Sequence, residues 1–360
     1  GYSEMKYLKV ERRLITPAWF TVAIPLFAII LALVTGAVFL YFMGVSPLQT
    51  YTSMFKASFG DTYGLTETIV KAIPLAMAGI AVTLSFKMLI WNIGAEGQIL
   101  MGALATAAAV RYFFVDQPFI MFWIMFAAAA TAGGIWAAFA GYLKARWNVN
   151  EIITTLMLNY IVLNMVDYFV YGPWRDPASL GFPMTAPFPN AARLPLLGDT
   201  RIHTGLFLAI FLAFFFWALL KWTRWGYEIR VIGENPKAAT FAGMNYLRNA
   251  VMVMFVSGAI AGLAGMCEIA GLQGRLQHGS SAGYGYTAII VAWLARLNPL
   301  TVLFVAFLIG ALFVGGDTLQ IVMRLPLSSI LVLQGLLLFF VLGGEFFRRY
   351  RIRIIWRGDN

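Results

Sequence analysis

The sequence predicts an all-α polytopic membrane protein. Of its 360 residues, 61% are hydrophobic and 12% are charged, whereas a soluble domain usually carries about 25% charged residues. Apolar runs of roughly 18 residues or more recur along the whole chain, and each is long enough to cross a bilayer as a helix. A membrane-spanning β-barrel would instead show short segments of alternating polarity.

The apolar runs predict about ten transmembrane helices. Their approximate ranges are 19–43, 69–86, 99–114, 119–142, 152–171, 205–222, 249–271, 286–294, 300–315 and 327–342. We expect a single transmembrane domain over residues 1–360, built as two pseudo-symmetric halves. Its parts are a first half at 19–171, an outer loop at 172–204, a second half at 205–342 and a basic cytoplasmic tail at 343–360. The outer loop, rich in proline and aromatic residues, is either ordered against the mouth of the bundle or a plain connector.

The formal net charge of +10 indicates topology rather than affinity for nucleic acid. Lys and Arg residues of membrane proteins gather in the cytoplasmic loops. With the N-terminus inside, the predicted inner segments hold most of the 26 Lys and Arg residues, including those near both ends of the chain. An even number of spans then places both termini in the cytoplasm.

The sequence lacks the residue patterns of an enzyme or of a metal site. Its one cysteine, Cys267, and two distant histidines, His203 and His278, make no metal-ligand spacing. No Ser/His/Asp arrangement and no pair of catalytic carboxylates is evident. The Gly-x-x-x-x-Gly-Lys-Ser/Thr phosphate loop is also missing, so the chain cannot hydrolyse ATP by that device. We therefore expect a protein that is not an enzyme and that binds no cofactor or metal itself.

Two glycine-containing segments interrupt the helical pattern at membrane depth. The first is Trp91–Gln98 and the second is Gly271–Tyr286. Irregular backbone inside a membrane must be buried in protein or line a water-filled cavity. Each segment comes after the second predicted helix of its half of the chain. Interrupted segments at corresponding positions of two halves indicate where a solute would cross the membrane.

Glu96 is the most informative single residue of the first segment. A carboxylate inside an apolar stretch is costly unless it is paired or solvated, so it should face the bundle interior or a cavity. Two interpretations stay open: Glu96 contacts a hydroxylated solute, or it belongs to a hydrogen-bonded structure that holds a broken helix.

Two further patterns concern helix packing. Tyr160, Asn164, Asp167 and Tyr168 recur at 3–4 spacing, so they share one face of the helix predicted at 152–171. These polar groups either line a pore or bond neighbouring helices together. The spacing Gly258-x-x-x-Gly262 favours close approach of two helices.

The polar segment between the helices predicted at 205–222 and 249–271 contains signals for a short helix. Gly233 is expected to break the chain, and Asn235 can cap a helix that begins at Pro236. Gly243 is suited to ending this helix after about two turns. Phe241 would then project as a knob from the cytoplasmic surface. The helix either inserts into a groove on a partner subunit or serves only as an interfacial connector.

Four segments resemble one known family. Gly233–Met244 is similar to the coupling segment of ABC-importer permeases of the ribose and branched-chain amino acid class. Trp91–Gly102, Asn150–Ile161 and Gly283–Pro299 resemble the same family, in the same order along the chain. Trp91–Gly102 and Asn150–Ile161, taken together, are most similar to the nucleoside-importer branch of this family. The bulky Trp293 departs from the smaller, glycine-containing run that is usual in relatives.

The resemblance implies a transport subunit of the cell (inner) membrane that works with partners. A cytoplasmic ABC ATPase would bind ATP and magnesium, a second and different permease would complete the path, and an external solute-binding protein would deliver a nucleoside. Ribose-like sugars and branched-chain amino acids are the alternative substrates. An ion-coupled secondary transporter is the alternative of another class, with Glu96 or Asp167 as its membrane carboxylate.

The resemblance also implies two sets of site residues. The path would be lined by Trp91, Asn92, Glu96, Gln98 and Tyr286. The ATPase would dock on Glu234, Asn235, Pro236, Lys237, Ala238, Ala239, Phe241 and Gly243.

Overall fold

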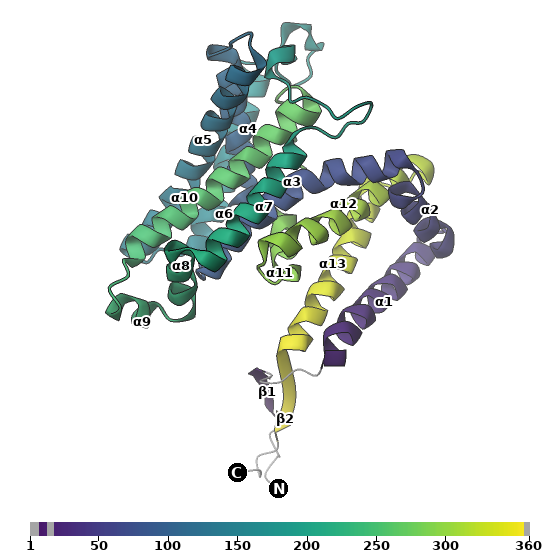
Figure 1. Ribbon diagram of the computed structural model, residues 1–360. Helices are drawn as coiled ribbons and strands as arrows, with labels where there is room; N and C mark the ends of the chain where they lie inside the picture. The colour runs from purple at the N-terminus through teal and green to yellow at the C-terminus, as the bar shows by residue number, and fades with distance from the viewer. Residues whose placement is uncertain (1–6, 13–17, 356–360) are drawn as a thin grey trace. The chain divides into compact units, whose positions relative to one another are not determined.

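The computed structural model describes residues 7–12 and 18–355, which form two compact units (Figure 1). Unit 1 draws on the two ends of the chain, Gly1–Ala57 and Gly315–Asn360, and unit 2 is Ser58–Val314. The division into two pseudo-symmetric halves around residues 172–204 stays a prediction.

Unit 1 is held together by a helical core and by a β-ribbon that joins the chain ends. Its elements are β1 (Tyr7–Arg12), α1 (Ala18–Phe42), most of α2 (Pro47–Phe59), the end of α12 (Pro299–Val322), α13 (Leu327–Arg349) and β2 (Tyr350–Ile355). Leu40, Leu319, Ile330 and Leu333 are buried together in its core. Burial of such side chains is the main force that holds the helices in place.

The β-ribbon corrects the prediction of a purely helical chain with a basic tail at 343–360. β1 and β2 pair antiparallel, with Tyr7 opposite Ile355, and α13 continues to Arg349. Residues 350–355 read Tyr-Arg-Ile-Arg-Ile-Ile, an alternation of period two that is typical of a strand. Residues 356–360 of the predicted tail lie outside the described residues.

Unit 2 contains the remaining helices around two buried ones. In chain order they are α3 (Thr62–Lys87), α4 (Ala95–Tyr112), α5 (Pro118–Trp147), α6 (Glu151–Tyr171), the short η1 (Pro177–Ser179) and η2 (Asn190–Ala192), α7 (Gly205–Trp222), α8 (Arg224–Glu234), α9 (Pro236–Phe241), α10 (Tyr246–Met266), the π-helix η3 (Cys267–Gln273), α11 (Tyr284–Leu294) and most of α12. Within their most apolar 18-residue windows, α3 is 89% buried and α10, together with η3, is 72% buried, against 28% for α5 and α6. The core of unit 2 therefore lies along α3 and α10.

Glycines allow α10 to approach α4 and α5 closely, which confirms the packing predicted for Gly258 and Gly262. A side chain at Gly262 would overlap the carbonyl oxygen of Ala129 in α5. A side chain at Gly102 in α4 would overlap the backbone of Gly262. Without a Cβ at these positions, the backbones of the three helices can come into van der Waals contact.

The predicted count of ten spans is not confirmed. Seven helices in the described part of the chain are long and apolar enough to cross a membrane, and the bent pair α1–α2, with 117° between its helices, makes up to eight. The two remaining predicted spans correspond to α4 and α11. α11 has 11 residues, too few to span a bilayer, and α4 is not among the spans. Both helices begin inside one of the two glycine-containing segments, α4 at Ala95 and α11 at Tyr284.

The loop at 172–204 is ordered against the end of unit 2. Backbone N–H groups of Thr185, Phe188 and Leu194 donate to carbonyl oxygens in the stretch 270–276, at 2.8, 2.7 and 2.9 Å. Trp174 and Phe188 are buried. The ordered packing expected for this loop is confirmed.

Candidate functional site

The two interrupted segments predicted from the sequence meet in space. The Oε2 atom of Glu96, in the first turn of α4, accepts a hydrogen bond of 2.8 Å from the backbone N–H of Gly285 in the first turn of α11. A Cβ at Gly285 would overlap the backbone of Glu96. Glu96 is 7% exposed, and a carboxylate at a helix N-terminus interacts favourably with the helix dipole. Glu96 therefore fastens the start of one broken helix to the start of the other.

Asn159 in α6 joins this contact to the irregular chain before α4. Its Oδ1 accepts from the N–H of Gly97 at 2.9 Å, and its Nδ2 donates to the carbonyl of Ile93 at 3.0 Å and to the hydroxyl of Tyr286 at 3.2 Å. Asn159 is 3% exposed. Sequence reasoning missed this role, although an amide on an apolar helix was the available signal, since buried amides require partners.

Asn92 and Gln98 form a second buried set of hydrogen bonds. The Oδ1 of Asn92 accepts from the N–H of Gly94 at 3.0 Å and from Nε2 of Gln98 at 2.9 Å. Its Nδ2 donates to Oε1 of Gln98 and to Oγ of Ser257, both at 3.1 Å. Ser257 in turn donates to the carbonyl of Ala81 in α3 at 2.7 Å. These bonds tie the irregular segment to α3 and α10.

Trp91 and Tyr286 are the accessible members of the predicted path set. Their exposed fractions are 36% and 41%. The ring of Trp91 stacks on that of Trp293, with centroids 5.8 Å apart and planes at 26°, and lies 4.9 Å from the ring of Phe86. Trp293, unusual for the resembled family, therefore packs in an aromatic cluster beside Trp91. A path role for all five predicted residues stays a prediction.

The polar stripe on α6 bonds another segment through one of its members, and a pore-lining role for the others stays a prediction. Asp167 bonds Nδ1 of His278, at 2.7 Å, in the loop that leads to α11, so it ties two segments together. Tyr160 and Tyr168 are exposed. They flank a groove together with Ile161, Asn164 and Met165.

The short helix predicted after Asn235 is present as α9. The Oδ1 of Asn235 accepts from the N–H of Ala238 at 3.1 Å, and Pro236 is the first helical residue. Gly243 has the left-handed backbone, with φ of +79°, that favours glycine after a helix. Ala239 is buried, whereas Phe241 is 93% exposed. The predicted caps and the projecting Phe241 are confirmed.

Gly233 does not break the chain, contrary to prediction. It lies inside α8, and the break falls at Asn235, whose backbone is extended. A side chain at Gly233 would overlap the carbonyl oxygen of Lys87 at the end of α3. This glycine is therefore needed for close packing, a requirement that a local reading of the sequence cannot distinguish from a turn.

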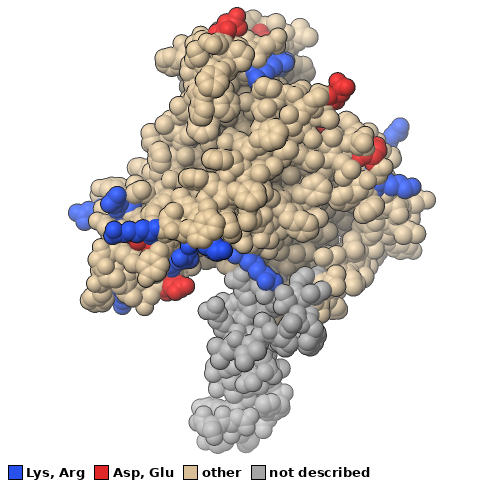
Figure 2. All heavy atoms as spheres, viewed as in Figure 1, with Lys and Arg blue, Asp and Glu red and all other residues tan. Residues whose placement is uncertain are grey.

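α8, which precedes α9, packs against three long helices. Gly226 packs against the backbone of Leu219 and Leu220 in α7, as Gly233 packs against α3. Trp225 donates from Nε1 to Oδ1 of Asn249 in α10 at 3.0 Å. Lys and Arg side chains gather over α8 and the adjoining end of unit 2 (Figure 2). α8 is therefore in contact with α3, α7 and α10.

Relatives with known roles place this architecture in a class. A glucose ABC transporter permease of Haloferax volcanii is 37% identical, with 98% of this chain and 96% of the relative covered. A guanosine ABC transporter permease of Bacillus subtilis is 32% identical, with 94% of this chain and 97% of the relative covered. A nucleoside ABC transporter permease of Lactococcus lactis is 28% identical, with 82% of this chain and 84% of the relative covered.

The fold and these relatives define a multi-pass membrane permease subunit of an ABC transporter, a transport component rather than an enzyme. The family model described as "Branched-chain amino acid transport system / permease component" matches residues 64–342. The chain belongs to this permease family, which confirms the resemblance found in its motifs.

Proposed function

We propose that this chain is the permease of an ATP-driven nucleoside importer and forms half of its translocation path. The observation that carries the proposal is the junction of the two broken helices, where Glu96 bonds Gly285 and where the accessible rings of Trp91 and Tyr286 occur. A nucleobase can stack on aromatic rings, and a ribose hydroxyl can bond the hydroxyl of Tyr286. The relatives that carry guanosine and nucleosides support this substrate class.

The hydrogen-bonded residues have a supporting role in this proposal. Asn92 and Gln98 bond each other and Ser257, and Glu96 bonds Gly285. They hold the path wall in place, while Trp91 and Tyr286 face the solute. Selectivity then rests mostly on an external solute-binding protein, because a tight site in the path would slow release.

Transport energy comes from a cytoplasmic ABC ATPase that holds ATP and magnesium. Membership of the permease family and the exposed Phe241 on α9 support this coupling. ATP binding moves α9, and α8 passes the motion to α3, α7 and α10. A second, different permease completes the path in the cell (inner) membrane, with both termini of this chain in the cytoplasm. The pairing of β1 with β2 supports placing both chain ends on one side.

A simple sugar is the second candidate substrate. The relative at 37% identity carries glucose, and glucose shares with a nucleoside a ring that bears hydroxyl groups. Branched-chain amino acids are supported only by the family's description. Family membership favours ATP-driven transport over an ion-coupled mechanism.

Competition for uptake distinguishes these substrates. The complete transporter, reconstituted in sealed vesicles with its ATPase and binding protein, would be supplied with labelled guanosine in the presence of unlabelled uridine, glucose, ribose or leucine. We expect nucleosides to compete and the other solutes not to compete. Uptake of labelled glucose that guanosine leaves unchanged would contradict the nucleoside proposal and support the sugar.

A further inference from the structure

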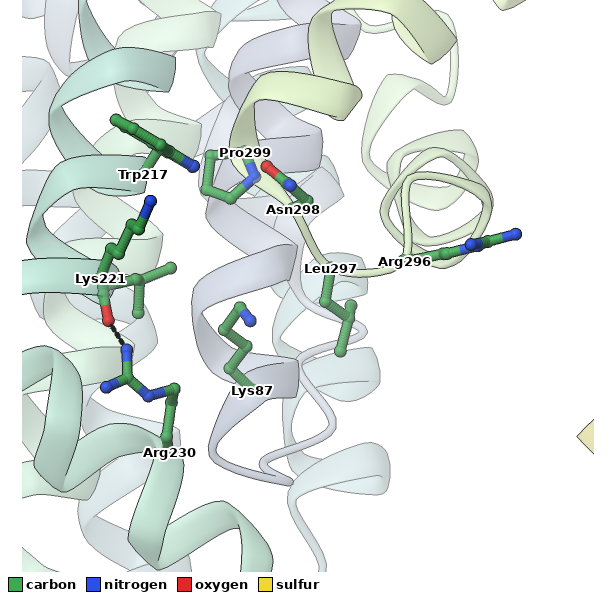
Figure 3. Close-up of a pocket in the computed structure, with 9 residues that line it drawn as sticks. Lys87, Trp217, Lys221, Arg230, Arg296, Leu297, Asn298 and Pro299 are labelled. Carbon is green, nitrogen blue, oxygen red and sulfur yellow. Dashed lines mark hydrogen bonds between the residues drawn. The ribbon is translucent and has the colours of Figure 1, made fainter. Parts of the chain in front are cut away.

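A cavity lined by basic residues lies within unit 2, between α3, α7, α8 and the loop after α11 (Figure 3). Its volume is about 260 Å³. The lining residues are Lys87, Trp217, Leu220, Lys221, Arg230, Arg296, Leu297, Asn298 and Pro299. We call this feature the basic cavity.

Positive charge dominates the basic cavity. Lys87 ends α3, Lys221 lies in the last turn of α7, and Arg230 comes from α8, while the side chain of Arg296 points away (Figure 3). No Asp or Glu is among the lining residues. Among the described residues, neither Lys87 nor Lys221 forms an ion pair with a carboxylate. The cavity therefore has cationic groups with no anion beside them.

The local contacts leave hydrogen-bond donors of these cations available. Arg230 uses one guanidinium nitrogen, Nη1, to donate to the carbonyl of Leu220. The ammonium group of Lys221 lies 4.9 Å from the ring centroid of Trp217 and 5.6 Å from that of Trp222. These rings attract the positive charge but accept no conventional hydrogen bond from the ammonium group. An anion with several oxygen acceptors, such as a phosphate, could bind the remaining donors of Lys87, Lys221 and Arg230.

An apolar strip leads away from the basic cavity along α7. Ile210, Phe214, Trp217 and Lys221 follow one another at spacings of three or four residues, so they lie along one side of the helix. Ile210 and Phe214 are exposed. A ligand with a phosphate at one end and a hydrocarbon chain at the other fits this arrangement. A Trp beside a Lys at a helix end is also typical of the membrane–water interface.

We propose that the basic cavity binds the phosphate headgroup of an anionic membrane lipid, with an acyl chain along α7. Basic pockets between membrane helices are known to take such headgroups. A bound phosphate offsets the mutual repulsion of Lys87, Lys221 and Arg230. It thereby holds α8 against α3 and α7, which are the contacts through which α9 would act. The binding site does not depend on the proposed function, whereas this consequence for coupling rests on it.

The first test compares ligands on the unaltered full-length chain. Delipidated protein in a neutral detergent receives phosphatidylglycerol, phosphatidylcholine or inorganic phosphate, and binding is followed by native mass spectrometry and by the temperature of unfolding. We expect retention and stabilisation by phosphatidylglycerol at concentrations where the other two have no effect. Equal binding of phosphatidylcholine would overturn the requirement for negative charge. Equal stabilisation by phosphate would overturn the lipid and leave a free anion site.

The second test changes the cations. The variant Lys87→Gln/Lys221→Gln should bind phosphatidylglycerol about 25-fold more weakly, since each basic residue near a membrane surface contributes about fivefold. Lys87→Arg/Lys221→Arg should retain binding. Arg248→Gln is the matched control, because Arg248 is exposed and lines a different groove. Unchanged binding in the double Gln variant, or an equal loss in the control, would overturn the site. If the double variant fails to fold, the comparison of lipids on the unaltered chain still decides.

Discussion

At the scale of single residues, the junction of the two broken helices depends on polar groups that are buried and hydrogen-bonded. Glu96, Asn92 and Asn159 lie within unit 2 and bond backbone atoms of the two irregular segments. A buried polar group without a partner costs about 1–3 kcal/mol, so each of these contacts specifies one arrangement of the segments. Glu96 and Asn92, which the sequence predicts to line a path, therefore hold the irregular segments in place.

Removing the Glu96 carboxylate should lower uptake without releasing the ATPase. In Glu96→Ala the N–H of Gly285 loses its acceptor, which we expect to destabilise the junction by about 1–3 kcal/mol. Glu96→Gln keeps an acceptor oxygen and should retain most uptake. The measurements are uptake in vesicles and co-purification of the ATPase. Normal uptake by Glu96→Ala would show that this junction is not needed for transport.

The stability of the protein should fall in mildly acidic solution because of His203. This residue lies in the loop before α7, where it is 1% exposed and accepts from the N–H of Gly205 at Nδ1. Burial lowers the pKa of His203 from 6.5 to about 4. The unfolded chain therefore binds a proton between these values while the folded chain does not, and stability is lost as the pH falls from 6.5 towards 4. The full effect is about 3 kcal/mol.

Thermal unfolding of the wild type and of His203→Gln, measured in detergent from pH 7.5 to 4.5, checks this expectation. The difference between their unfolding temperatures should change in favour of the variant as the pH falls. Identical pH slopes for wild type and His203→Gln would contradict a neutral buried His203.

At the scale of elements, the proposed coupling depends on the successive helices α8 and α9. Asn235 separates the two helices, and α8 is fixed to three long helices by Gly226, Gly233 and Trp225. α9 contributes one buried residue, Ala239, and projects Phe241. This arrangement suits a helix that receives force at its exposed side and passes it to the bundle.

Changing the exposed side of α9 should uncouple the transporter. Lys237→Glu with Phe241→Asp places two carboxylates where a docking helix offers a cation and an apolar ring, so we expect loss of substrate-stimulated ATP hydrolysis and of uptake. Lys237→Arg with Phe241→Leu is the conservative control and should retain both activities. Co-purification of the ATPase and unchanged uptake in the first variant would disprove the docking role of α9.

Elements with local signals could be predicted from the sequence, and those fixed by distant contacts could not. Asn235 and Gly243 adjoin the two ends of α9, so the local sequence was enough to predict them as its caps. Gly233 was misread because its role depends on the carbonyl of Lys87, far away in sequence. Asn159 and the β1–β2 pairing were missed for the same reason, since their partners come from other parts of the chain.

At the scale of the whole molecule, the chain is a permease subunit of an ABC transporter, and the proposed energy source is a separate ATPase. Its sequence lacks the phosphate loop of an ATPase, and its relatives are ABC transporter permeases. Family and class were predictable because four motifs occur in order. The substrate was less predictable, because a glucose permease and a guanosine permease have similar sequence identities to this chain, 37% and 32%.

Accumulation of solute by sealed liposomes tests the central claim most directly. Liposomes would carry this chain and its partner permease, with or without the ATPase and ATP inside and the binding protein outside. We predict accumulation of labelled guanosine only when all components and ATP are present, and none with an imposed proton or sodium gradient alone. Accumulation by the permeases alone under an ion gradient would contradict the account.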